Sequence, residues 1–315
     1  MLAKLRCAVI GVGNMGKNHA RIYSQLGKLI AVADPSERTG KQVAAKYRCS
    51  YYTDYKVMLK REKIEAVSVV VPTKYHESVA LECLNRNIPT LLEKPISDSL
   101  KSAKQILEQA EKSKTLLMVG HVERFNPAVV TLKKLIKEKK FGTIISLNSI
   151  RVGINPPPTK GSDVSLDLAI HDIDIFNYLL EETPIESKLI KGKIFAANRA
   201  DHASILLRYN NASGIIQTNW LTPIKIRKLY ITGTTGFAEL DYINQKLILY
   251  EHSRLNNYQD NFKKLLSLSH SLTKRVFISK REPLKEELTY FLTLIKNKKL
   301  EYPYFAVNAL KVALS

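Results

Sequence analysis

The sequence has few cysteines, a single tryptophan and no long apolar run. Its three cysteines, Cys7, Cys49 and Cys83, are isolated from one another and form no C-x-x-C pair. An odd number of isolated cysteines excludes a complete set of disulfides and favours a reducing compartment. No stretch reaches the roughly 18 apolar residues that a membrane-spanning helix needs, and the first apolar run, Leu5 to Val12, ends in glycines rather than at a cleavage site for export. We therefore expect a soluble cytoplasmic protein without a membrane span.

Acidic residues are also scarce: 29 Asp and Glu stand against 49 Lys and Arg, which gives a formal net charge of +20. Such a surplus attracts anions, including nucleic acids, acidic lipids and phosphorylated small molecules. Both halves of the chain share it, and lysine outnumbers arginine 35 to 14. A nucleic-acid-binding protein more often clusters arginine, whose guanidinium makes paired contacts with bases. We therefore expect a lysine-rich surface and no nucleic-acid partner.

Residues 261–281 combine basic and apolar side chains without any acid. The basic residues are Lys263, Lys264, Lys274, Arg275, Lys280 and Arg281. One interpretation is a basic amphipathic helix that touches a membrane surface or a partner. The other is a loop and a short helix packed on the body of the protein.

The first 120 residues alternate short apolar runs with helical stretches, which is typical of a parallel sheet with crossover helices. The predicted strands are 5–10, 29–33, 66–71, 90–92 and 116–119, and the predicted helices are 16–26, 37–46, 77–85 and 99–112. This pattern predicts an α/β fold with a doubly wound Rossmann domain over residues 1–121.

The rest of the chain follows a different pattern, with longer alternating strands separated by tight turns. The predicted strands are 143–152, 187–194, 202–208, 214–220, 226–232, 237–241 and 246–250. One predicted helix ends near residue 140, and three others span 164–180, 285–296 and 305–314. We expect residues 122–315 to form an α+β domain with a large open, mainly antiparallel sheet.

The segment Gly11-Val12-Gly13-Asn14-Met15-Gly16 follows a predicted strand and opens a predicted helix. In this setting Gly11 permits a tight turn, Gly13 lets the backbone approach a pyrophosphate, and Gly16 lets the helix pack against the sheet. The positive end of the helix then faces the phosphates, with Asn14 and Met15 in its first turn. The motif predicts a dinucleotide site.

An acid, Asp34, stands at the end of the next predicted strand, 23 residues after Gly11. A carboxylate there accepts hydrogen bonds from the adenosine ribose and repels a 2′-phosphate, so we expect NAD rather than NADP. Arg38 lies nearby and would soften this preference.

Four further segments stand in a characteristic order. They are Val70-Val71-Pro72-Thr73-Lys74-Tyr75-His76, Leu92-Glu93-Lys94-Pro95, Val119-Gly120-His121-Val122-Glu123-Arg124-Phe125-Asn126-Pro127 and Leu166-Asp167-Leu168-Ala169-Ile170-His171-Asp172-Ile173-Asp174. In this order and spacing, nearly the whole chain resembles the Gfo/Idh/MocA (glucose-fructose oxidoreductase, inositol dehydrogenase) family. Within the family, residues 172–174 and 219–228 look most similar to UDP-N-acetylglucosamine 3-dehydrogenases.

The resemblance implies a catalytic role for Lys94, beside the nicotinamide and the substrate hydroxyl. Its ammonium would hold the hydroxyl oxygen and stabilise the developing alkoxide. Glu93 would bind the nicotinamide ribose, and Thr73 and His76 would line the nicotinamide side. Without the neighbouring motifs, a lysine before a proline at a strand end is usually a solvated surface residue.

Asp167 and His171 are four residues apart on a predicted helix, so both should project from one face. An imidazole suits the role of general base, because its pKa lies near working pH, and Asp167 would orient it or bind the sugar. The alternative is a metal site that also includes Asp172 and Asp174, but hydride transfer to nicotinamide needs no metal, and we expect none.

Two other residues have open interpretations. Arg124 would clamp a substrate phosphate or hydroxyl, or form a salt bridge between the domains. Trp220, in a predicted strand, is expected in the core or at a subunit interface rather than stacked on a ligand base.

These inferences predict an NAD-dependent dehydrogenase that oxidises a sugar, with C3 of a UDP-N-acetylhexosamine as the favoured position. The alternatives are a dehydrogenase or reductase of a free sugar or polyol, and a non-catalytic NAD-binding regulatory protein of the same fold. By resemblance we expect a homodimer or homotetramer formed through the C-terminal sheet, and functional coupling to an aminotransferase. The chain ends at Ser315, earlier than the family leads us to expect, so we expect a truncated terminal helix.

Overall fold

The computed structural model describes residues 5–154, 162–195, 199–251 and 272–315. The chain forms two compact units: residues up to Val122 join residues 282–314, while Glu123–Arg281 form the other unit with Ser315. We expected residues 282–314 in the second domain, and this was wrong. Helix α9 (Pro283–Lys296) contacts α1 (Asn14–Leu26), and α10 (Tyr304–Leu314) contacts α5 (Leu100–Lys112), because their apolar faces need burial that these helices provide.

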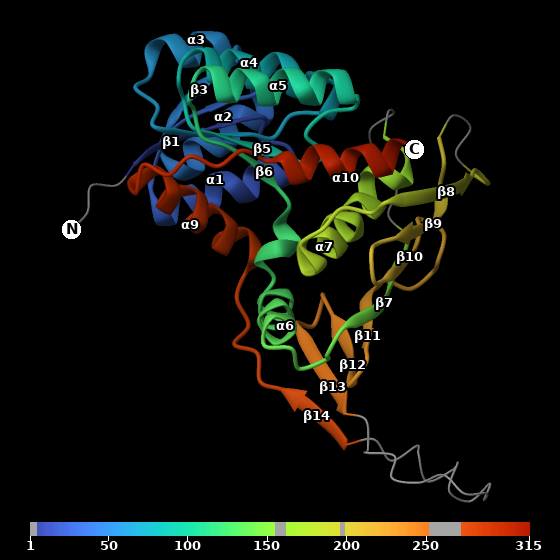
Figure 1. Cartoon of the computed structure of the whole chain (residues 1–315). Helices are drawn as coiled ribbons and strands as arrows, with labels where there is room; N and C mark the ends of the chain where they lie inside the picture. The colour runs from blue at the N-terminus through green and yellow to red at the C-terminus, as the bar shows by residue number, and fades with distance from the viewer. Residues whose placement is uncertain (1–4, 155–161, 196–198, 252–271) are drawn as a thin grey trace, which may run out of the picture. The chain divides into compact units, whose positions relative to one another are not determined.

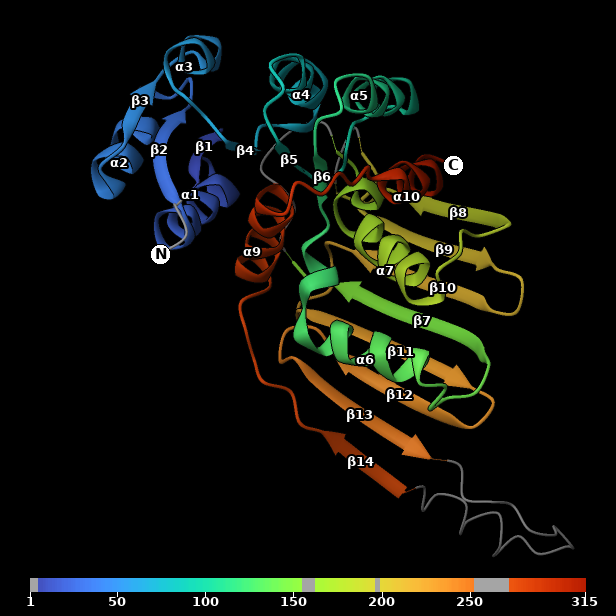
Figure 2. The ribbon, with the colours of Figure 1, turned by 60° about the vertical axis from the view of Figure 1, so that its left-hand side comes forward.

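The N-terminal unit contains a six-stranded parallel sheet in the order β3-β2-β1-β4-β5-β6 (Figures 1 and 2). The strands are β1 (Arg6–Ile10), β2 (Lys28–Ala33), β3 (Ser50–Tyr52), β4 (Ala66–Val69), β5 (Thr90–Glu93) and β6 (Leu117–Gly120). The remaining helices are α2 (Glu37–Tyr47), α3 (Tyr55–Arg61) and α4 (His76–Asn85). This strand order confirms the Rossmann fold. It also places the ends of β1 and β4 at the point where the order reverses, which is where such sheets bind ligands.

The sequence prediction missed β3 and α3. Strand β3 is only three residues long, too short for a periodic pattern, and it forms because it pairs with β2. Its Tyr51 packs over α2 so closely that a Cβ at Gly40 would lie 2.0 Å from the ring. Helix α3 is capped by Asp54, whose side chain accepts a hydrogen bond from Lys56 N at 2.8 Å.

The second unit contains an eight-stranded sheet in the order β14-β13-β12-β11-β7-β10-β9-β8. The strands are β7 (Ile144–Val152), β8 (Glu186–Gly192), β9 (His202–Arg208), β10 (Ser213–Asn219), β11 (Ile226–Gly233), β12 (Gly236–Asp241), β13 (Lys246–Glu251) and β14 (Leu272–Val276). Every pairing is antiparallel except that of β7 with β10. The expected α+β domain with a mainly antiparallel sheet is therefore confirmed.

Helices α6 (Pro127–Lys137) and α7 (Ile170–Leu180) pack on one face of this sheet (Figure 2). On the other face, alternate residues are exposed, and several are large and apolar: Ile190, Leu206 and Ile215 are 57%, 49% and 42% exposed. Strand side chains alternate between faces, so these residues share the face opposite the helices.

Strand β14 falls within the basic segment and pairs with β13 at the edge of the sheet. For residues 272–276, both helical interpretations were therefore wrong, since pairing with β13 decides the conformation. Residues 261–271 lie outside the described residues.

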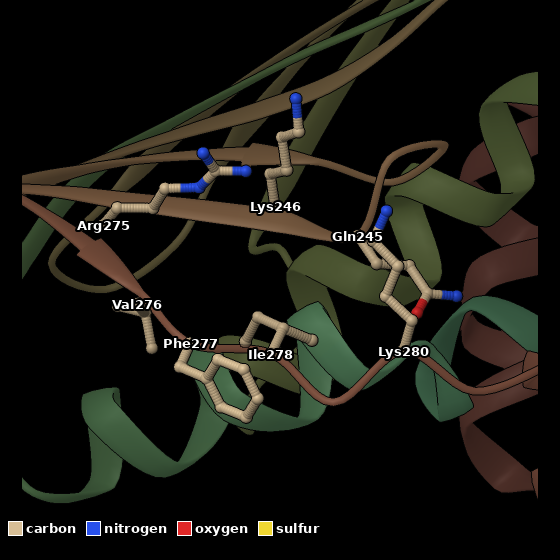
Figure 3. Close-up of a pocket in the computed structure, with 7 residues that line it drawn as sticks. All are labelled: Gln245, Lys246, Arg275, Val276, Phe277, Ile278 and Lys280. Carbon is tan, nitrogen blue, oxygen red and sulfur yellow. The ribbon is translucent and has the colours of Figure 1, made fainter.

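Beside β14 a shallow hollow of about 340 Å³ is lined by Gln245, Lys246, Arg275, Val276, Phe277, Ile278 and Lys280 (Figure 3). Exposed basic residues on an edge strand oppose pairing with a further strand. In the described part of the chain, no helix is long and apolar enough to cross a membrane.

Candidate active site

The loop between β1 and α1 and the first turn of α1 contain three glycines with different roles. Gly11 has φ +84°, and a Cβ there would lie 2.4 Å from the carbonyl oxygen of Val70. A Cβ at Gly16 would lie 1.9 Å from the carbonyl oxygen of Gly11. At Gly13 nothing lies within 4 Å of a Cβ, so the space in front of the helix is open there. An open, side-chain-free approach to the N-terminus of α1 suits a phosphate group.

Asn14 and Met15 form the exposed first turn of α1, beside this open space. The carboxylate of Asp34 lies against the same loop. It accepts hydrogen bonds from Val12 N and Ser36 N, both at 2.8 Å. These two contacts fix the carboxylate of Asp34 next to the glycine loop. Arg38, the residue expected to soften the preference for NAD, is exposed in the first turn of α2.

Glu93, the last residue of β5, belongs to a buried polar network. Its Oε1 lies 3.0 Å from His19 Nε2, and His19 Nδ1 lies 3.0 Å from Ser68 Oγ, which also contacts Tyr23 OH at 2.7 Å. Burial disfavours the charge of Glu93, but the hydrogen bond and charge of His19, with those of Lys94, hold the Glu93 pKa below its usual range. The network keeps a carboxylate charged at the carboxyl end of the sheet.

Lys94 follows β5 directly and is half-buried. Its backbone N–H donates to Glu93 Oε2 at 3.2 Å, and the Lys94–Pro95 peptide is cis. The backbone around Lys94 is therefore held by the same carboxylate that His19 fixes.

His76 begins α4, after the loop that follows β4. Its side chain is buried, with Nδ1 2.8 Å from Pro95 O and Nε2 2.9 Å from Val71 O, and burial lowers its pKa. Both ring nitrogens contact the backbone, so the ring connects the loop after β4 to the turn after Lys94. That His76 lines the nicotinamide side stays a prediction. Thr73, half-buried in the short 3-10 turn Thr73–Tyr75, remains beside this loop.

In the second unit, the predicted helix 164–180 begins with a π-helical turn, Ser165–Ala169, before α7. Such turns occur frequently at functional sites. Asp167 lies in this turn, and its Oδ2 accepts a hydrogen bond from the indole Nε1 of Trp220 at 3.2 Å. Trp220 is 3% exposed and packs with Val164 and Ala203, which confirms its expected place in the core.

His171 lies in the first turn of α7 and is half-buried. The next residue, Asp172, anchors that helix. Asp172 accepts hydrogen bonds from Arg151 Nε and Nη2 at 2.6 and 3.2 Å, and Glu123 accepts from Arg151 Nη1 at 3.0 Å. Burial opposes the charge on Arg151, but Asp172 and Glu123 raise its pKa above the ordinary value. This buried cluster fixes the start of α7 to β7.

Arg124 is engaged by Asp174. Its Nε and Nη2 donate to the two carboxylate oxygens, both at 2.7 Å. Of the two interpretations, the structure shows the ion pair, but within the second unit and not between domains. Asp172 and Asp174 each bind an arginine, which leaves the alternative metal site without two of its donors.

Sequence reasoning missed Arg151 and the partners of His19. The alternation in β7 gave a signal for Arg151: it shares the inward face with Leu147 and Ser149, and a buried guanidinium requires an acid. No local pattern pointed to the contact of His19 with Glu93, because the two residues are 74 positions apart.

Comparison with known proteins agrees with this arrangement. Residues 5–121 match the oxidoreductase family with an NAD-binding Rossmann fold, and residues 129–239 match the GFO/IDH/MocA C-terminal domain. The N-terminal domain is therefore an NAD(H)-binding domain, and the expected class of enzyme, a dehydrogenase acting on CH–OH groups, is confirmed.

Several individual proteins are similar to this chain. UDP-N-acetylglucosamine 3-dehydrogenase of Acidithiobacillus ferrooxidans is 28% identical over 78% of this chain and 77% of its own length, and its solved structure superimposes with a TM-score of 0.87 at 25% identity, covering 100% and 96% of the two chains. The scyllo-inositol 2-dehydrogenase (NAD(+)) of Bacillus subtilis is 31% identical over 56% of this chain and 54% of its own. A levoglucosan dehydrogenase solved with NADH and levoglucosan shares the fold, with a TM-score of 0.85 at 19% identity over 98% and 94% of the chains. With matches in both of its units, the chain belongs to the Gfo/Idh/MocA family of oxidoreductases.

Proposed function

We propose that the protein is an NAD-dependent dehydrogenase that oxidises the C3 hydroxyl of a UDP-N-acetylhexosamine. The observation that carries this proposal is the extent of the likeness to UDP-N-acetylglucosamine 3-dehydrogenase, which covers 78% of the chain. The inositol dehydrogenase of Bacillus subtilis matches over 56% of the chain. A free sugar or polyol is therefore the second candidate substrate.

The cofactor proposal rests on the glycine loop and Asp34. The open approach at Gly13 and the first turn of α1 would hold the pyrophosphate, with Gly11 and Gly16 shaping the loop. Asp34 would accept hydrogen bonds from the adenosine ribose and repel a 2′-phosphate, which favours NAD over NADP. When bound, the nicotinamide supplies the hydride-accepting chemistry.

The chain's own residues would manage the proton. We assign His171 as the base that takes the hydroxyl proton on a ring nitrogen. Lys94 Nζ would donate to the hydroxyl oxygen and stabilise its developing negative charge. Asp167, held by the Trp220 indole, would bind the sugar or orient His171.

Three further residues complete the assignment. Glu93 and Thr73 would contact the nicotinamide ribose side. Arg124 would act through Asp174, by holding α7 in place, because two of its nitrogens already donate to that carboxylate.

The assembly and cellular setting are also part of the proposal. Exposed Ile190, Leu206 and Ile215 on the open sheet face would be covered in a homodimer or homotetramer. A 3-keto product would be a substrate for an aminotransferase. We place the protein in the cytoplasm, because its three cysteines are free thiols.

A substrate panel tests the proposed function. The purified protein is incubated with NAD, and in parallel with NADP, and with UDP-N-acetylhexosamines, other UDP-sugars, free hexoses and inositols, while absorbance of the reduced cofactor is followed. We expect reduction of NAD with a UDP-N-acetylhexosamine, and mass spectrometry should show a product lighter by two hydrogens. A 3-deoxy substrate analogue is the matched control and should give no reduction. Oxidation of inositol or a free hexose alone would replace the proposed substrate, and no reduction with any substrate would overturn the proposal.

A further inference from the structure

A basic pocket lies at the β8 edge of the second unit. It has a volume of about 410 Å³ and is lined by Asp163, Leu166, Lys191, Gly192, Lys193, Arg199 and Ala200. Strand β8 is the last strand of its sheet (Figure 2). The lining thus contains three cationic side chains and one carboxylate, which gives it a positive charge.

Asp163 in the pocket lining and Asp201 next to it both accept hydrogen bonds from backbone N–H groups. Asp163 accepts hydrogen bonds from Ser165 N and Leu166 N at 3.0 and 3.2 Å, and Lys191 Nζ donates to its other oxygen at 3.0 Å. Asp201, 2% exposed, accepts from Ile194 N and from Phe195 N, both at 2.8 Å. The acid within the lining is therefore already engaged by backbone N–H groups and by one lysine, and the loop that follows β8 is anchored by a buried carboxylate.

The guanidinium of Arg199 is held over an aromatic face. Its central carbon lies 5.0 Å from the centroid of the Trp220 ring, within the range of a cation–π interaction. Trp220 is itself fixed in the core, so the guanidinium rests on a rigid support. A flat guanidinium and a lysine that line one pocket, here Arg199 and Lys193, are a combination that binds phosphate oxygens through charge-assisted hydrogen bonds.

The same tryptophan connects the pocket to Asp167. One side of the indole carries Arg199, while its N–H donates to the Asp167 carboxylate at 3.2 Å. Leu166, which lines the pocket, directly precedes Asp167 in the π-helical turn Ser165–Ala169. The pocket therefore adjoins the residue to which we assign sugar binding.

We propose that this pocket binds the diphosphate of a nucleotide-linked sugar, with Arg199 and Lys193 as its phosphate ligands. The proposal rests on the proposed function, and it makes the substrate class a nucleoside diphosphate sugar in place of a free sugar or polyol. A neutral polyol would gain nothing from a pocket of this charge, whereas a diphosphate gains from each cation. The site is separate from the glycine loop, which lies in the other unit.

Direct binding of UDP and of inorganic pyrophosphate, measured by titration calorimetry, tests the proposal. Saturating NADH is present throughout, so that the glycine loop does not contribute a second diphosphate site. The test variant is Lys193→Gln with Arg199→Gln. The matched control is Lys188→Gln, which changes an exposed lysine of β8 that is not part of the pocket lining. Circular dichroism and the melting temperature check that both variants are folded.

We expect the double variant to weaken UDP and pyrophosphate binding by about tenfold or more, since charge-assisted hydrogen bonds are lost. NADH binding should stay unchanged, Lys188→Gln should match the wild type, and rising salt should reduce the difference between variants. Uridine should bind with the same affinity to all three proteins. Equal affinity for UDP in the double variant and in Lys188→Gln would overturn the proposal. The basic residues would then serve only to oppose pairing of the exposed sheet edge with another strand.

Turnover separates this inference from the proposed function. If the wild type oxidises a sugar but the double variant binds UDP as tightly as Lys188→Gln does, the dehydrogenase assignment stands and the diphosphate site falls. If no sugar is oxidised but the double variant loses UDP binding, the site stands and the proposed function falls.

Discussion

The imidazole of His19 lies 3.0 Å from the carboxylate of Glu93, although the two residues are 74 positions apart in the chain. His19 comes from the helix that begins at the glycine loop, and Glu93 ends the strand that precedes Lys94. One buried contact thus connects the loop proposed to bind phosphate with the turn proposed to carry the catalytic lysine. Both parts of the proposed cofactor site belong to one rigid network.

The Glu93 contact predicts a pH-dependent stability. The pKa of Glu93 is below its ordinary value of 4.5, so its contribution is present above that pH and is lost as the pH falls through the lower, folded value. His19→Leu removes the hydrogen bond and should cost about 1.5–3 kcal/mol at neutral pH. The melting temperature deficit should shrink toward pH 4, because a buried Glu93 without His19 becomes protonated. A control variant, Arg6→Leu, breaks a half-exposed pair with Glu65 and should change little. A deficit independent of pH would contradict the role of the Glu93 charge.

The glycine loop predicts two opposite phenotypes for the same substitution. Gly16→Ala should destabilise the protein by about 1–3 kcal/mol or more, because its Cβ would lie 1.9 Å from the carbonyl oxygen of Gly11. Gly13→Ala should fold normally, since nothing lies within 4 Å of its Cβ, and should weaken NADH binding on the order of tenfold. Melting temperatures and NADH fluorescence titrations measure the two effects. Unchanged NADH affinity in Gly13→Ala would show that the phosphates of the cofactor do not bind at this loop.

Asp34 predicts the cofactor preference. Asp34→Ala should lower the ratio of kcat/KM for NAD over NADP on the order of tenfold or more, because the ribose contact and the repulsion of a 2′-phosphate both disappear. The side chain also binds Val12 N and Ser36 N, so some general damage to the loop is expected. That damage affects both cofactors alike and cancels in the ratio. Asp54→Ala, which removes the cap of α3, is the control and should leave the ratio at its wild-type value.

The buried arginine of β7 predicts a large loss of stability. Arg151→Leu leaves the buried Asp172 and the half-buried Glu123 without the arginine and should cost about 3–5 kcal/mol. Arg208→Leu breaks an exposed pair with Glu186 and should cost less than about 1 kcal/mol. Urea unfolding followed by circular dichroism compares the two variants. Similar midpoints would show that the buried cluster does not hold α7 on the sheet.

The proposed roles of Lys94 and His171 predict a loss of turnover without a loss of cofactor. Lys94→Ala and His171→Ala should each lower kcat on the order of a hundredfold or more, since each removes a group that handles the substrate proton or its oxygen. The Kd for NADH should change little, and Lys101→Ala, an exposed lysine of α5, should behave as wild type. Turnover near the wild-type rate in both variants would refute the assigned roles.

The sequence by itself determined the features that depend on neighbouring residues. The spacing of Gly11, Gly13 and Gly16 encodes a turn that tolerates no other residue at two positions, and apolar runs encode most strands of both sheets, with β3 and β14 as the exceptions. Asp34 was found in the same way, because it directly follows a strand, whereas Lys94 was singled out by the resemblance of its segment to the family. These signals are local, so they can be read along the chain.

Only the tertiary structure decided the rest, because it depends on contacts between distant segments. The pairing of β3 with β2, the packing of residues 282–314 on the first unit and the burial of His76 between two loops leave no periodic trace in the sequence. The same holds for the ion pair of Arg124 with Asp174 and for the basic pocket around Arg199. Their free energy comes from burial and charge pairing that exist only once the chain has folded.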